Sequence, residues 1–146
     1  MSLINDIKKE IVNRISTDVT SVQEISGYEK IPQRGFPAVV VFCSGNEADY
    51  ISTIDNMRTY SFVIRIFEQI GHDIDNNDAK ERAERIVGNV VSDLINSFDK
   101  YYTLGDTVDY CLASPSKWGY AQIDTGWMRT ADIVFQVKKS FDIING

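Results

Sequence analysis

The segment HDIDNNDAKERAE (residues 72–84) holds the densest group of side chains that could bind a metal ion. Four oxygen-bearing residues stand at positions 1, 3, 5 and 12 of a calcium-loop pattern: Asp73, Asp75, Asn77 and Glu84. The sixth position of such a loop turns sharply and favours glycine, but here it is Asp78. The preceding segment also has the pattern of a strand, whereas an EF-hand needs a helix. Aspartates that cap a strand-to-helix connection explain the same residues, so no metal is expected.

Catalytic patterns are equally weak. His72 is the single histidine, so any Ser-His-Asp or Cys-His scheme must pass through it, and a lone loop histidine is typical of a surface. The sequence contains no G-x-S-x-G, H-E-x-x-H, C-x-x-C, G-x-G-x-x-G or P-loop pattern. Its paired carboxylates lie where turns and helix starts favour them. We therefore expect neither an enzyme nor a bound cofactor.

The stretch TYSFVIRIFEQ (residues 59–69) alternates like a strand but is apolar on both faces. A one-sided antiparallel sheet shows a polar face to water, so this strand needs a second covering layer, from its own chain or from another. We expect the first face to pack on a long helix, namely Tyr60, Phe62, Ile64 and Ile66. On the other face, Val63, Arg65 and Phe67 should approach a neighbouring subunit or a loop. Arg65 should pair with a carboxylate, because an unpaired buried guanidinium is costly.

Aromatic side chains are abundant, with seven tyrosines, seven phenylalanines and two tryptophans. Aromatic residues and arginine are enriched in the cores of protein interfaces. Six aromatic residues fall on strand surfaces that are exposed or apolar on both faces: Tyr60, Phe67, Tyr110, Trp118, Tyr120 and Trp127. This abundance favours association, although any one of these residues fits an intramolecular core equally well. The interface candidates are Val63, Arg65, Phe67, Trp118 and Tyr120.

The first half of the chain reads as a helix followed by three strands. An amphipathic helix is predicted over residues 3–15, where isoleucines recur at three- and four-residue spacings. Residues 39–43 have the pattern of a buried strand. The segment EADYISTIDNMRTYSFVIRIFEQ then predicts a hairpin, or a bent pair of strands, around Asp55 and Asn56.

The second half begins with the long helix. Apolar residues repeat with helical period from Asp78 to about Tyr101, and Asp78 with Glu81 forms an acidic variant of the capping box. Beyond it, Pro115 and the turn at residues 124–126 separate two or three further strands. The order predicts one α+β domain over residues 1–146: a mainly antiparallel sheet with the N-terminal helix and the long helix packed on one face.

Charge and composition narrow the class of protein. The net charge is −6, from 21 acidic and 15 basic residues, which gives no general reason to bind nucleic acid. No apolar run approaches the roughly 20 residues of a membrane span, and the N-terminus lacks the apolar core of a signal peptide. We therefore expect the chain to stay in the compartment where it is made. Cys43 and Cys111 fit buried thiols in a reducing cytoplasm better than a disulfide.

Four segments, in order, resemble the tail terminator (tail completion) proteins of long-tailed bacteriophages over nearly the whole chain. They follow the N-terminal helix and read FPAVVVF, NMRTYSFVIRIFEQ, DAKERAERIVGNVVSDL and ADIVFQVKKSFDI. The most characteristic piece is the N-x-R-T-Y-x-F-x-I-R-I-F strand, followed by an acidic turn and a helix with A-E-R-I. The resemblance lies in the order of these segments along the chain and in their general residue pattern.

The resemblance implies a subunit that assembles as a ring, typically a hexamer, on the head-proximal end of the tail tube. Such a ring stops tube polymerisation, meets head-completion or stopper proteins, and leaves a channel through which DNA passes without specific binding. It is part of the virion, has no membrane partner, and is assembled in the host bacterial cytoplasm. Two alternatives stay open: another head-tail joining protein, such as a stopper or tail-tube subunit, or a small α+β ligand-binding domain.

Overall fold

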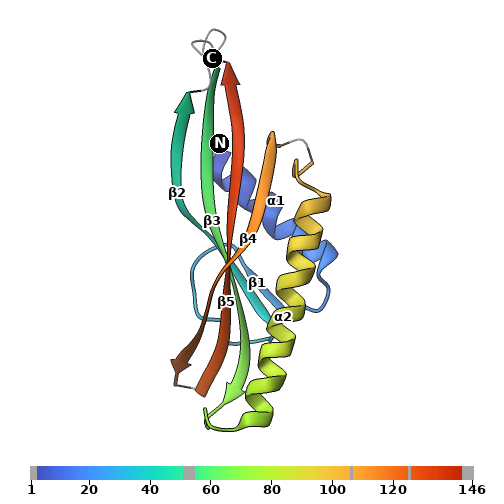
Figure 1. Cartoon of the computed structure of the whole chain (residues 1–146), viewed down its shortest axis with the longest axis vertical. Coiled ribbons are helices and arrows are strands. Elements are labelled where there is room, and N and C mark those ends of the chain that lie inside the picture. Colours follow the sequence, from blue (N-terminus) through green and yellow to red (C-terminus); the bar gives the residue numbers. More distant parts are fainter. Residues whose placement is uncertain (1–2, 51–54, 106, 125, 143–146) are drawn as a thin grey trace.

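Two helices lie on one face of a five-stranded sheet in the computed structural model, which describes residues 3–50, 55–105, 107–124 and 126–142 (Figure 1). The elements follow the order α1 (Leu3–Asp18), β1 (Glu24–Ser26), β2 (Ala38–Tyr50), β3 (Asp55–Gly71), α2 (Asn77–Lys100), β4 (Tyr110–Ile123) and β5 (Gly126–Asp142). The predicted α+β class is confirmed, with the N-terminal helix and the long helix both packed on the sheet.

The strand order in the sheet is β1-β2-β3-β5-β4, and all neighbours are antiparallel except β1 and β2. Figure 1 shows the strands running along the long axis of the molecule, with the end of β4 and the start of β5 at the bottom. We call this the lower end of the sheet and the opposite end the upper end. The longest ladder joins β3 to β5, from Asp55–Asp142 at the upper end to Gly71–Trp127 at the lower end. These two strands form the centre of the sheet.

The main core lies between the sheet and the helices. The first face of β3 is buried there, as predicted, with Tyr60, Phe62, Ile64 and Ile66. Isoleucines of α1 and apolar residues of α2 cover it: Ile7, Ile11, Ile15, Val87, Leu94 and Phe98. Each such side chain contributes about 1.5–3 kcal/mol when it leaves water. The helical period of these residues in the sequence is therefore the source of the helix layer.

Polar contacts join the end of α1 to the C-terminal half of α2. The Ser97 hydroxyl donates to Asp18 Oδ2 at 2.7 Å, and the Arg14 guanidinium lies 3.8 Å from the centre of the Tyr101 ring. The two helices therefore form one layer. No helix in the described part of the chain combines the length and apolarity that a membrane crossing requires.

The cap of α2 differs from the prediction. Asn76 has an extended backbone, and its side chain accepts a hydrogen bond from the Ala79 amide at 3.1 Å. Asp78 therefore lies in the first turn instead of at the cap. Asparagine and aspartate cap helices about equally well, so the sequence placed the start of the helix correctly but assigned the cap to the wrong residue.

The strand boundaries also differ from the prediction. Residues 39–43 and the following extended run form one strand, β2, because a bulge between Cys43 and Gly45 lets the strand continue. The remaining strand of the first half is β1, which the sequence missed because three residues carry no measurable alternation. Pro115 does not separate two strands but lies at a bulge inside β4, which the strand tolerates at the edge of the sheet.

The face of the sheet away from the helices, which we call the far face, is partly covered by the chain's own loop at residues 27–37. Phe67 is buried in a second cluster with Val40 and Met128, and Phe36 of this loop packs against it. The loop is held by the Glu24 carboxylate, which accepts hydrogen bonds from the amides of residues 34 and 35 at 2.8 and 3.2 Å. The second covering layer is therefore supplied by this chain over the lower part of β3.

The thiol predictions are half correct. Cys111 is buried, and burial raises the pKa of its thiol to about 12, with the Asp99 carboxylate adding to the shift. Cys43 is exposed, against expectation, and lies on β2 beyond the residues that β1 covers. The two cysteines lie on strands that are not neighbours and are not joined by a disulfide.

The lower end of the sheet is closed by two glycines. Gly126 and Gly71 both have positive φ, at 127° and 123°. A Cβ atom on Gly126 would lie 2.7 Å from the carbonyl oxygen of Gly71, which is closer than such atoms approach. The start of β5 can therefore meet the end of β3 only without a side chain at this position.

We expect Gly126→Ala to lower the free energy of unfolding by about 2–4 kcal/mol, because the new Cβ adds a clash to an unfavourable φ. Gly71→Ala is the matched control, because it has the same backbone strain but no atom within 4 Å of the new Cβ. Its free energy of unfolding should fall by only about 1–2 kcal/mol. Urea unfolding measures both values. Equal losses would contradict the proposed clash.

Candidate functional site

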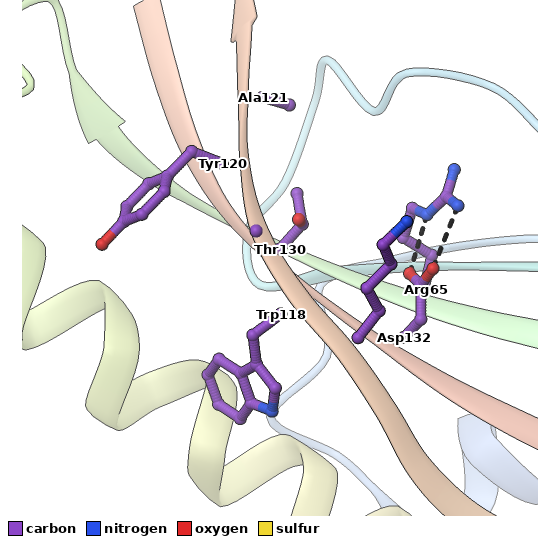
Figure 2. Close-up of a pocket in the computed structure, with 8 residues that line it drawn as sticks. Arg65, Trp118, Tyr120, Ala121, Thr130 and Asp132 are labelled. Carbon is purple, nitrogen blue, oxygen red and sulfur yellow. Dashed lines mark hydrogen bonds and ion pairs between the residues drawn. The ribbon is translucent and has the colours of Figure 1, made fainter.

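Three of the five interface candidates line one hollow of about 260 Å³ at the edge strand β4: Arg65, Trp118 and Tyr120 (Figure 2). Trp118 and Tyr120 lie on the helix side of the sheet, and Arg65 lies on the far face. The edge strand separates the two groups, and Gly119 lies between the two aromatic residues. The hollow is therefore a feature of the sheet edge.

A bulge in β4 creates this arrangement. The register with β5 shifts between Pro115 and Trp118, which leaves one extra residue in the edge strand. Bulges bend the strand and redirect side chains. As a result Lys117 is exposed at the rim of the hollow, while Trp118 turns toward α2. The Trp118 ring passes 4.0 Å from the place where a Cβ of Gly88 would be.

Arg65 is held by a carboxylate, as predicted, and the carboxylate belongs to its own chain. Its Nε and Nη2 donate to the two oxygens of Asp132 at 2.8 and 3.1 Å, directly across the β3–β5 ladder (Figure 2). Glu29 of the covering loop lies 3.4 Å from Nη1. The Asp132 hydrogen bond raises the pKa of the Arg65 guanidinium against the opposite effect of burial. The pair therefore needs no second subunit.

Arg129 lies beside Trp118 and Tyr120 on the helix side of the sheet, and no role for it is predicted from the sequence. Its guanidinium lies 5.0 Å from the Trp118 ring centre and 4.4 Å from that of Tyr120. It donates to the Gly119 carbonyl and to Glu84 Oε1, both at 3.0 Å. An arginine on an otherwise apolar strand face, between Trp127 and Ala131, was the available signal. The cluster presents the aromatic and arginine side chains that are typical of binding surfaces.

The aromatic rings of this cluster remain half exposed. Trp118 and Tyr120 keep 39% and 47% of their surface in contact with solvent. By contrast, the structure buries Tyr60 and Phe67, which the sequence analysis had grouped with the exposed or two-faced aromatic residues. The reason is that the helices cover Tyr60 and the loop at residues 27–37 covers Phe67.

Val63 belongs to a different part of the far face. It is half-buried and stands in one row across three strands, between Phe42 of β2 and Val134 of β5. On β4 the exposed Leu112 lies close to the end of this row. We call these four residues the far-face row. It is apolar and partly open to solvent, so it is the part of β3's second face that remains incompletely covered.

The calcium pattern is explained by local structure. Asp73 Oδ1 accepts the amide hydrogen of Asp75 at 2.9 Å in the turn before α2, and Glu84 pairs with Arg129 at 3.0 Å. Asn77 is the first residue of α2. Among the described residues, no group of three or more histidine, cysteine, aspartate or glutamate side chains is placed to hold a metal ion. His72 is exposed in the same connection.

Glu68 is a buried carboxylate on the helix side, directly opposite Arg129 in the β3–β5 register. Within the described residues, its Oε2 and the Arg129 Nε are both buried without a hydrogen-bond partner. Burial raises the pKa of the Glu68 carboxyl, although the Gln69 amide and the charge of Arg82 act in the opposite direction. The charged form of Glu68 therefore opposes folding.

A scan against protein-family models finds no match for this chain, and a search of curated proteins finds none either. The residues themselves therefore carry the functional argument.

We expect Arg129→Lys to lower the free energy of unfolding by about 1–2 kcal/mol. Lysine lacks the planar guanidinium group that lies against the two aromatic rings and donates to the Gly119 carbonyl at the same time. Tryptophan fluorescence during urea unfolding measures the change. Arg85→Lys is the matched control, since Arg85 pairs with Glu81 on an exposed helix face and should change stability by less than about 0.5 kcal/mol. Similar losses in both variants would show that the stacked geometry contributes nothing.

We expect Glu68→Gln to stabilise the protein by about 1 kcal/mol at neutral pH, because the neutral amide avoids burying a charge. A carboxyl with a raised folded-state pKa opposes folding above its unfolded pKa. This penalty fades as the pH falls through the folded-state pKa. The advantage of the variant should therefore shrink in acid. Unfolding free energies measured across acid to neutral pH test this, and an advantage independent of pH would contradict it.

Proposed function

We propose that this protein is a structural subunit of a bacteriophage virion, a tail terminator that forms a ring, typically of six copies, at the head-proximal end of the tail tube. The ring stops tube polymerisation and joins the tail to the head-completion or stopper proteins. Support comes from the segments that resemble tail terminators, because they form β2, β3, α2 and β5. These elements make up most of the sheet and its long covering helix.

One observation carries the proposal: this chain covers the second face of β3 only in part. The loop at residues 27–37 buries Phe67, but the far-face row, which includes Val63, stays partly open to solvent. On the other side of β4, Trp118 and Tyr120 are also half exposed. These patches face different directions, so contacts between copies would join unlike surfaces. Unlike surfaces that meet head to tail produce a ring when the rotation closes.

The charge of the chain suits a DNA channel. A net charge of −6 repels phosphate. A wall that bound phosphates would slow the passage of the genome, because backbone contacts dominate the affinity of proteins for DNA. The proposal therefore includes passage of DNA without specific binding, partners in the tail tube and in the stopper, and no catalytic role. The virion is the site of function, and assembly takes place in the bacterial cytoplasm.

Two experiments test this function. In sedimentation and negative-stain images, the purified protein should form closed rings whose population grows with concentration. Mixed with tail tubes, it should bind at one tip and block their extension. A tube subunit would instead lengthen the tubes, and a stopper would leave their extension unchanged. A protein that stays monomeric at high concentration, with and without tubes, would end the proposal.

A further inference from the structure

The two outermost long strands of the sheet are each blocked over their lower part. β2 and β4 stand at opposite sides of the sheet in Figure 1. On β2, the short strand β1 pairs with Ala38–Val40. On β4, the bulge between Pro115 and Trp118 interrupts the strand, and Lys117 lies within it. Proline, lysine and bulges are the devices by which proteins prevent an edge from pairing.

The upper part of β4 has none of these devices. On β2, a bulge between Cys43 and Gly45 lies at the lower limit of the upper part, and in the described residues no strand lies outside β2 above this bulge. Residues 110–114 of β4 read YCLAS and contain neither charge nor proline. Tyr110 and Leu112 are 42% and 53% exposed, while the alternating residues Cys111 and Ala113 face the helices. In the described residues, no strand lies beside the outer edge of this segment. An edge strand with exposed apolar side chains and unpaired backbone groups is a template for another strand.

The two unprotected segments lie at the same height in the sheet. Following the register across β5 and β3, Tyr110 is level with Glu47 of β2, and Leu112 is level with Gly45. The blocked parts are level as well, because the β4 bulge falls beside Val39–Val41 and β1 covers Ala38–Val40. In the described residues, therefore, neither strand has an outer neighbour over the upper interval, which starts on β2 at the Cys43–Gly45 bulge. Over the lower interval β1 covers β2 and the bulge interrupts β4.

The strand directions also match. Three antiparallel steps separate β2 from β4, so the two strands run in opposite directions. A second copy placed beside the first in the same orientation brings its β2 next to β4 as an antiparallel neighbour. Antiparallel pairing gives hydrogen bonds perpendicular to the strands. The contact leaves the same two edges open at the ends of the pair, so it repeats until a ring closes.

We propose that residues 110–114 of β4 pair with residues 44–47 of β2 in a second copy of this chain, which joins the sheets of the ring into one continuous wall. This proposal rests on the ring-forming function proposed above and names the contact that builds it. The occupant is a second copy because the same chain carries the complementary edge, level and antiparallel. The far-face rows of adjacent copies then line up along the wall.

Hydrogen exchange of the wild-type protein tests the pairing directly. We compare backbone amides in a dilute monomeric sample with those in assembled rings. Exchange should slow by about tenfold or more in peptides covering residues 110–114 and 44–47, since paired amides are protected. The internal control is residues 119–123 of β4, beyond the bulge, where no change is expected. Rings that form without protection at residues 110–114 would overturn this contact but leave the ring function standing.

A charge at the edge provides a second test. Leu112→Lys places an ammonium group on an exposed position, so the subunit should keep its circular dichroism and melting temperature. Its assembly should weaken by about tenfold or more in dissociation constant, as measured by sedimentation. The matched control is Tyr28→Lys, because Tyr28 lies on the covering loop and is 61% exposed. This variant should assemble normally. Normal assembly of Leu112→Lys would overturn the pairing, whereas loss of rings in wild type would overturn both proposals.

Discussion

The need to cover both faces of the central strand β3 is the constraint on which the rest of the structure depends. A strand with apolar residues on each side cannot leave either face in water without losing the free energy of burial. The helix layer covers one face. The isoleucines of α1 recur at three- and four-residue spacings, which places them all against the sheet. For the other face the chain uses a loop without regular structure, held by the Glu24 carboxylate and by the contact of Glu29 with Arg65. The loop covers only part of the length of β3.

Two arginines on opposite faces of the sheet solve the burial of charge in different ways. Arg65 meets its cross-strand neighbour Asp132 in a two-point contact, which satisfies both groups locally. The side chain of Arg129 points outward and donates hydrogen bonds to Gly119 and Glu84, although Glu68 is its cross-strand neighbour. The outward turn leaves a buried carboxylate without a second partner, which costs stability, but it also places two aromatic rings around a cation at the sheet edge. Such a cost is common where a surface serves an interaction.

Long periodic patterns made the fold class predictable, and features set by single residues did not follow from them. The helix at residues 77–100 and the alternation of β3 are strong because many residues share one period. The strand β1 has only three residues, and its parallel pairing with β2 depends on the crossover loop at residues 27–37, which no local pattern encodes. The carboxylate partner of Arg65 followed from the cost of an isolated charge, but its identity as Asp132 required the register. The stack on Arg129 required the β4 bulge, which sequence spacing does not reveal.

The long ladder between β3 and β5, regular from Asp55–Asp142 to Gln69–Met128, has a mechanical consequence. Its hydrogen bonds lie across the strands, so a force along the long axis of the protein loads many of them together in shear instead of opening them one after another. The helix layer, in which Ser97 binds Asp18 and Arg14 lies over Tyr101, runs beside this ladder and stiffens it against bending. The geometry of this ladder therefore resists extension of the protein along its length.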